Sequence, residues 1–82
     1  MKARVEVRFK PGVLDPEAEA IRRALEPMAD GLLGEVTRTR VIELELATAD
    51  PEEARRLAAT MADQLLANPV IEAYVVQVDN GR

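Results

Sequence analysis

The stretch LLANPVIEAYVVQV, residues 65–78, ends a predicted helix and supplies a predicted final strand. Asn68 suits the left-handed conformation that often ends a helix, and Pro69 cannot continue one. The strand at residues 70–78 carries apolar side chains at both alternating positions: Ile71, Ala73 and Val75 on one, Tyr74, Val76 and Val78 on the other. A strand with one solvated face alternates apolar and polar residues instead. We therefore expect this strand to be covered on both sides, with one face forming a self-association or partner interface.

The 82 residues fit a single domain, residues 1–82, of a size that hides only about 60–65% of its unfolded surface. Docking onto a partner or a second copy is expected for so small a core. The net charge of −4 disfavours nucleic acids and anionic membranes, which bind clustered basic surfaces. The alternating start of the chain does not resemble a signal peptide, so we expect a cytoplasmic protein.

The sequence contains no His, Cys, Ser or Trp. Their absence excludes the imidazole base, the serine and cysteine nucleophiles and nearly every transition-metal site. The four glycines are scattered and form no phosphate-binding loop. We predict no catalytic, cofactor-binding or metal-binding residues. Nine Arg against two Lys, together with five Pro, favour a heat-stable protein.

Two helices and four strands are predicted. Residues 2–10 alternate strictly between apolar and charged side chains, which is typical of a strand with one face in the core. Asp15-Pro16 and Asp50-Pro51 each predict a helix start, because Asp caps the first amides and Pro fits the first helical position. The first helix carries an apolar stripe, and Pro27 is expected to kink or end it. The stripe comprises Ala18, Ile21, Leu25 and Met28.

Between the helices, residues 35–38 and 41–47 are predicted strands with a turn at Thr39-Arg40. The order strand, helix, strand, strand, helix, strand predicts an α+β, ferredoxin-like two-layer sandwich. Its four-stranded, antiparallel-type sheet should carry both helices on one face. We expect the first and third strands to be central and parallel, with charges pairing across their open face. Those charges are Arg4, Glu6 and Arg8 beside Glu43 and Glu45. Gly81 and Arg82 are expected to be frayed.

Other functions of this fold fit the sequence less well. An RNA-recognition module stacks bases on aromatic side chains of its central strands, but Phe9 is in phase with the core. An acylphosphatase-like site needs an Arg-bearing phosphate loop and an Asn, which Lys10-Pro11-Gly12 does not supply. A regulatory, ACT-like domain that binds a small molecule stays open, because Gly12 follows the first strand where such ligands sit. A free-standing enzyme is the least favoured reading.

The residues also resemble a known family. Val13-Leu14-Asp15-Pro16, and above all LLANPVIEAY at residues 65–74, are similar to PurS, the small subunit of phosphoribosylformylglycinamidine synthase. The first strand, the Glu-rich strand IELEL at residues 42–46 and the total length agree as well. The resemblance covers nearly the whole chain. Pro69 departs from the family pattern, which has another small residue there, and should stiffen the helix-to-strand break.

The resemblance implies a non-catalytic subunit of an ATP-dependent ligase in purine biosynthesis. A glutaminase subunit of that complex releases ammonia, and a synthetase subunit that uses ATP and Mg transfers it to phosphoribosylformylglycinamide. The small subunit forms a homodimer or higher homo-oligomer, bridges the other two subunits and aids ammonia transfer. On this reading the chain itself binds no cofactor, and ATP and Mg belong to the partner synthetase.

Overall fold

The structure is a computed structural model, and it describes residues 1–79. The predicted fraying of Gly81 and Arg82 therefore lies outside the described residues. Three strands, two α-helices and two short helical turns follow one another along the chain. In order they are β1 (Lys2–Phe9), α1 (Pro16–Leu25), the 3₁₀ turn η1 (Glu26–Met28), β2 (Arg40–Glu45), α2 (Pro51–Met61), the π-helical turn η2 (Ala62–Leu66) and β3 (Glu72–Asp79).

The strands form an antiparallel sheet in the order β2-β1-β3. In register, Val5 of β1 lies between Ile42 of β2 and Val76 of β3. The α+β class is confirmed. The predicted fourth strand is absent from residues 1–79, and the predicted parallel pairing of the first and third strands is wrong, since β1 and β2 are antiparallel. The chain does not turn back at Thr39-Arg40, so residues 35–38 make no hairpin with β2.

The core lies between the sheet and α2. Val5 and Val7 are its largest fully buried side chains, and the facing surface of the helix is lined by alanines. Ala54, Ala58 and Ala62 are spaced four residues apart, so they fall on one face of the helix, and none of them is exposed to solvent. Small side chains let the helix lie close to β1 and β3, and the resulting core is thin.

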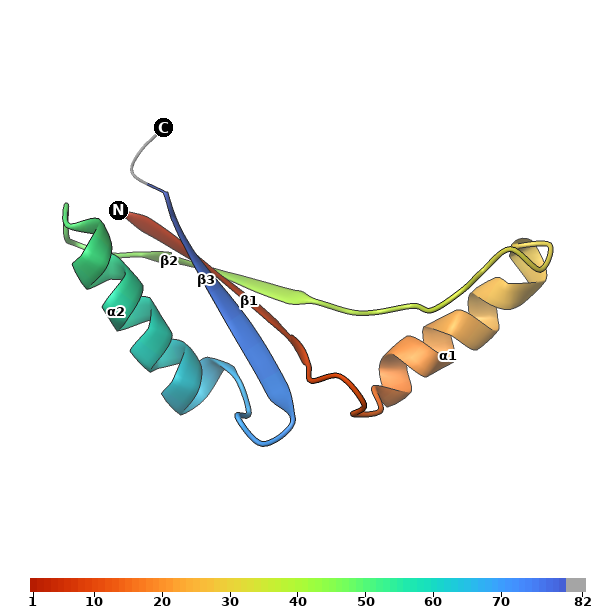
Figure 1. Ribbon diagram of the computed structural model, residues 1–82. Coiled ribbons are helices and arrows are strands. Elements are labelled where there is room, and N and C mark those ends of the chain that lie inside the picture. The colour runs from red at the N-terminus through yellow and green to blue at the C-terminus, as the bar shows by residue number, and fades with distance from the viewer. Residues whose placement is uncertain (80–82) are drawn as a thin grey trace.

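α1 does not cover the sheet. Figure 1 shows it at the far side of the molecule from α2, connected to the sheet by two long segments. The prediction that both helices cover one face is therefore not confirmed for a single chain. The radius of gyration is 16.1 Å, whereas a compact chain of this length has one of about 12 Å. We call residues 13–39 the arm, and the sheet with α2 and η2 the body.

The helix starts are confirmed and one helix end is corrected. The Asp15 carboxylate accepts hydrogen bonds from the amides of Glu17 and Ala18, at 3.0 and 3.2 Å. The α-helix stops at Leu25, two residues before Pro27, as predicted. The left-handed conformation expected at Asn68 is wrong, because among residues 1–79 only Asp30 has a positive φ without being glycine. Asn68 instead makes a side-chain turn, its Oδ1 accepting a hydrogen bond from the Val70 amide at 3.1 Å.

The alanine face of α2 generates a stability prediction. Ala58→Leu places three extra carbon atoms where the side chain has no exposed surface, and such overpacking costs roughly 1–3 kcal/mol. Ala59→Leu, at a half-buried position on the same helix, should change the free energy of unfolding far less. Urea denaturation of both variants measures the difference. Equal stabilities would contradict the close packing of α2 on the sheet.

Candidate interaction surface

The six residues predicted to form an interface divide between two faces of the sheet. Tyr74 and Val76 lie on the side of α2 and pack against the core, and Val78 shares their face. Ala73 and Val75 point to the opposite, open face, where Val75 is 54% exposed. Ile71 precedes β3 in the turn, and its carbonyl accepts a hydrogen bond from the Lys10 amide at 2.9 Å. The last strand is thus covered on one face and open on the other within a single chain.

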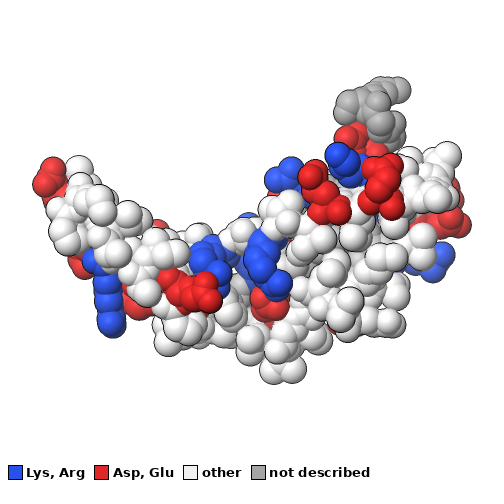
Figure 2. Space-filling view, turned by 180° about the vertical axis from the view of Figure 1, so that it is seen from behind, with Lys and Arg blue, Asp and Glu red and all other residues white. Residues whose placement is uncertain are grey.

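Charged side chains dominate the open face of the sheet. Arg4 of β1 lies opposite Glu43 of β2, but it pairs with Glu6 of its own strand, so the predicted Arg–Glu pairing between these two strands is not observed in residues 1–79. The ion pairs that form are Lys2 Nζ to Glu43 Oε2 at 4.0 Å and Arg4 Nε to Glu6 Oε1 at 3.7 Å. Figure 2 shows acidic and basic side chains lying among one another on the molecular surface. Such exposed pairs contribute little to stability, and their main effect is to keep this face polar.

The arm has an uncovered apolar surface. Leu32 is 88% exposed, Met28 74% and Leu14 72%, and Ile21 and Leu25 are also exposed. The sequence predicted the stripe on α1 correctly but assigned its cover to the wrong surface, namely this chain's own sheet. The signal that could have revealed the error is the pair Thr39-Arg40, which lacks the Asn-Gly chemistry of a tight hairpin. Isolated exposed apolar residues are ordinary, whereas a group of them marks an interaction site.

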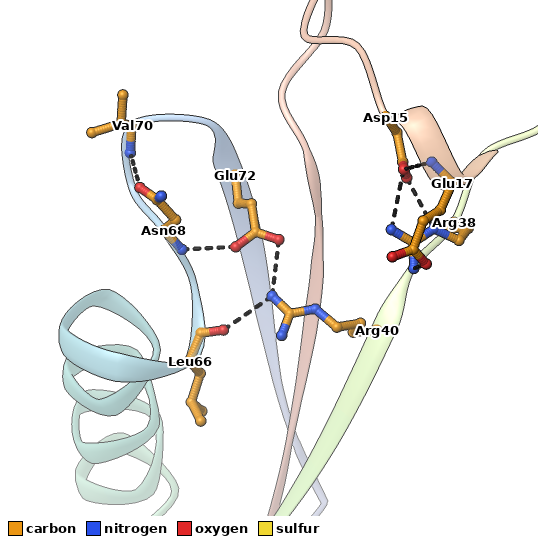
Figure 3. A network of polar contacts seen from close by, with 8 residues as sticks. All are labelled: Asp15, Glu17, Arg38, Arg40, Leu66, Asn68, Val70 and Glu72. Atoms are coloured by element: carbon orange, nitrogen blue, oxygen red, sulfur yellow. Dashed lines mark hydrogen bonds and ion pairs between the residues drawn. The ribbon is translucent and has the colours of Figure 1, made fainter. Parts of the chain in front are cut away.

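Arg38 ties the two ends of the arm together. Its guanidinium donates Nε–H to Asp15 Oδ2 and Nη2–H to Asp15 Oδ1, both at 3.1 Å, and Nη1 lies 2.9 Å from Glu17 Oε2. Figure 3 shows this fork meeting the carboxylate that also caps α1. The hydrogen bond from Arg38 lowers the pKa of Asp15 below its ordinary value of 3.8, and the amides of α1 add to the effect. The start of the helix is thereby fixed to the segment that leads into β2.

A second network fixes the start of β2 to the body. Arg40 donates Nη2–H to Glu72 Oε2 at 2.9 Å and to the Leu66 carbonyl at 3.2 Å. Glu72 Oε1 accepts a hydrogen bond from the Asn68 amide at 2.8 Å, as Figure 3 shows. That amide, followed by Arg40, lowers the pKa of Glu72 below its ordinary value. Arg38 and Arg40, two residues apart, therefore anchor the arm and the body respectively.

A cavity of about 400 Å³ lies where the arm meets the body. Its wall includes the loop from Lys10 to Val13, with Gly12 at a φ of +83°, and the segment from Glu35 to Arg38. Both cationic and anionic side chains reach it, among them Arg8, Arg22 and Glu19.

Residues 1–79 contain no group of three His, Cys, Asp or Glu that could hold a metal ion. Within the same residues, no helix is long and apolar enough to cross a membrane.

The Asp15–Arg38 pair makes stability depend on pH. Because the pKa of Asp15 is lower in the folded chain than in the unfolded one, the pair stabilises the fold above pH 3.8. That stability is lost as the pH falls through the lower, folded-state value. Asp15→Asn keeps a capping oxygen but loses the charge. The variant should be less stable than the parent at neutral pH, and the gap should close in acid.

Urea denaturation at one protein concentration, from pH 7 down to about pH 2.5, measures that gap. Glu17→Gln removes a more exposed carboxylate from the same guanidinium and should have a smaller effect. A gap between Asp15→Asn and the parent that is independent of pH would show that the charge pair contributes nothing.

Comparison with known proteins agrees with the resemblance. The PurS family, described as phosphoribosylformylglycinamidine (FGAM) synthase, matches residues 2–80. The PurS subunit of Archaeoglobus fulgidus is 38% identical over 76 residues, which cover 93% of this chain and 95% of that protein. The PurS subunit of Methanothermobacter thermautotrophicus is 41% identical over 79 residues, covering 92% and 88%.

Solved structures give the same answer for the fold. The crystal structure of Methanocaldococcus jannaschii PurS is similar with a TM-score of 0.87 and 33% identity, over 99% of this chain and 98% of that one. That protein is described as one of the subunits of formylglycinamide ribonucleotide amidotransferase in the purine biosynthetic pathway. Bacillus subtilis PurS has a TM-score of 0.82 and 35% identity, over 95% and 96%. The extended, three-stranded chain with its arm therefore belongs to the PurS family, the PurS subunits of phosphoribosylformylglycinamidine synthase.

Proposed function

We propose that this chain is a cytoplasmic, non-catalytic scaffold of the phosphoribosylformylglycinamidine synthase complex. It self-associates, bridges the glutaminase and the ATP-dependent synthetase subunits, and aids the transfer of ammonia between them. ATP and Mg act on the synthetase partner in this proposal. The observation that carries it is the apolar stripe of the arm. The stripe is exposed in the single chain, whereas a protein that works alone would be expected to bury it.

The geometry supports a division of labour between two surfaces. The apolar side chains of the arm, such as Leu25 and Met28, suit a permanent contact between identical chains, because obligate interfaces are the more hydrophobic ones. The open face of the sheet is charged and carries the exposed Val75 beside Ala73. Such a polar face suits the docking of a partner protein that is already folded. We assign self-association to the arm and docking of the larger subunits to this open face of β3.

The residue types present support a role without chemistry of its own. The chain has no His, Cys or Ser, and each carboxylate with a lowered pKa is paired with Arg as part of the scaffold. Glu19, for example, lies 2.7 Å from Arg22 one turn along α1. A general acid or base instead has its pKa moved toward neutrality. These carboxylates are shifted the other way.

A pull-down tests the scaffold role. The tagged chain should capture the glutaminase and synthetase subunits of its own organism together when ADP and glutamine are present. Val75→Arg, on the open face, should reduce that capture by about tenfold or more, since an interface that buries an unpaired charge loses several times RT. Bound partners are measured by quantitative gel densitometry.

Thr60→Arg supplies the matched control, since it adds the same charge at an exposed position on α2. It should leave capture unchanged. No capture of either subunit by the parent chain, under every nucleotide condition, would refute the bridging role. Equal capture by the two variants would refute only the assignment of β3.

The cavity beside Gly12 favours one second candidate, an ACT-like domain that binds a small regulatory molecule. At about 400 Å³ the cavity is large enough for an amino acid, and Arg8 and Lys10 at its wall would attract a carboxylate or phosphate. A ligand that binds only the folded chain raises its melting temperature.

A thermal-shift screen of the proteinogenic amino acids and purine nucleotides decides this candidate. At a concentration a hundred times the dissociation constant, binding adds about 2.7 kcal/mol to stability, which is a shift of many degrees for a chain this small. A shift that Arg8→Ala abolishes would support the regulatory function. A screen without a shift at millimolar concentrations would exclude it.

A further inference from the structure

The outer edge of β3 is an open strand edge that lacks the usual protection. Among residues 1–79, β3 pairs only with β1, so its other side ends the sheet. All eight of its residues are in register with β1, and no bulge interrupts the strand. Its sequence, EAYVVQVD, contains no Pro, Gly or Lys. Natural proteins usually blunt an open edge with a bulge, a Pro or a Lys, because unpaired backbone groups otherwise attract another strand.

The hydrogen-bond pattern shows which backbone groups of β3 point outward. The Lys10 amide donates to the Ile71 carbonyl at 2.9 Å, so these opposite residues form a hydrogen-bonded pair. Such pairs alternate along an antiparallel ladder, and the register therefore turns the backbone groups of every second residue of β3 away from β1. The outward residues are Glu72, Tyr74, Val76 and Val78. Of their four amides, that of Glu72 donates to the Asn68 carbonyl at 2.7 Å, which leaves three for another strand.

The side chains of β3 make this edge complementary to itself. Its charged residues, Glu72 and Asp79, stand at the two ends, and residues 73–76 are apolar. In a parallel pair of copies each carboxylate would lie beside its equivalent, and like charges directly opposite one another destabilise a sheet. In an antiparallel pair centred on Val75, Glu72 lies opposite Val78 and no two charged residues of β3 face each other.

A second copy of β3 therefore fits this edge. We infer that two copies of the chain pair antiparallel along their β3 edges, with the two-fold axis at Val75. Val75 is 54% exposed in the single chain and packs against its equivalent in the pair. Tyr74 lies opposite Val76, and an aromatic residue beside a β-branched one is a favourable cross-strand pair. The contact is isologous, as a two-fold axis requires.

The pairing leaves room for the helices that cover the sheet. α2 contacts both β1 and β3. With strands about 4.8 Å apart, a helix midway between these two strands lies about 10 Å from its equivalent across the axis, which is the spacing of packed helices. The two sheets join into one sheet, and their charged open faces form a single, wider surface for the larger subunits. The inference rests on the proposed self-association and adds a contact to it, on the edge opposite β2 and without the arm.

Disulfide trapping tests the pairing and its register. The chain has no native Cys, so an introduced one reports only the designed contact. Val75→Cys places two thiols at the axis, where the Cα atoms of a non-hydrogen-bonded pair lie about 4.5 Å apart. Oxidised glutathione, added to the purified chain at high micromolar concentration, should convert this variant to a covalent dimer.

Gln77→Cys is the matched control, since it is exposed on the same face of the same strand. Its two thiols would lie about 13 Å apart along the strands, beyond the reach of a disulfide, so it should give about tenfold less covalent dimer. A mixture of Ala73→Cys and Gln77→Cys chains should form the mixed dimer, because these residues lie opposite each other. Equal trapping of Val75→Cys and Gln77→Cys, or no trapping of Val75→Cys, would overturn the inference.

Light scattering separates this contact from self-association through the arm. Val75→Lys places two like charges opposite each other at the axis and should halve the mass of the assembly. Gln77→Lys adds the same charge opposite Ala73 and should keep the parent mass. Both positions are exposed, so the fold should survive either change. An assembled Val75→Lys chain with the parent mass would overturn the β3 contact and leave association through the arm and the bridging role standing.

Discussion

An amphipathic helix must bury its apolar stripe, and in this chain α1 has no surface of its own to bury it on. The remaining features follow from that constraint. Leu25, Met28 and Leu32 stay exposed, the radius of gyration exceeds that of a compact chain, and the sheet ends at β2 with an open edge. Hydrophobic burial is the main favourable term in folding, so the exposed stripe of α1 adds nothing of this kind to the stability of a single chain. The stability of the described chain therefore rests on the body, where the sheet and α2 bury the core.

Ion pairs orient the arm where hydrophobic packing does not. Asp15 combines two roles, as the cap of α1 and the acceptor for Arg38. Glu72 likewise joins the turn after η2 to Arg40 at the start of β2. The contact of Arg38 with Asp15 is bidentate, so it sets an angle as well as a distance. The two networks thus hold the arm and the body on either side of Thr39, with Arg38 in one and Arg40 in the other.

Most local features were predictable from the sequence, apart from the conformation of Asn68, and long-range placement was not. The N-caps at Asp15 and Asp50, the end of α1 before Pro27 and the alternation of β1 follow from nearest-neighbour chemistry and were predicted correctly. Both wrong predictions about the sheet depend on Thr39-Arg40, because a hairpin and a continuous strand place the same residues in β conformation. Side-chain pattern cannot separate them, and the choice depends on contacts with residues far along the chain. The predicted interface residues could not be placed for the same reason. The apolar residues of β3 lie on both faces of the strand, and only the pairing register shows which face is toward the core.

Because residues 35–45 run straight, they also set the distance and the orientation between the arm and the body. Side chains on a strand change sides at every residue, so removing one residue would turn everything beyond it to the opposite side, while removing two would only shorten it. The orientation of the arm relative to the body is therefore encoded in whether the segment has an odd or an even number of residues. We therefore expect this segment to tolerate the insertion or deletion of two residues better than that of one.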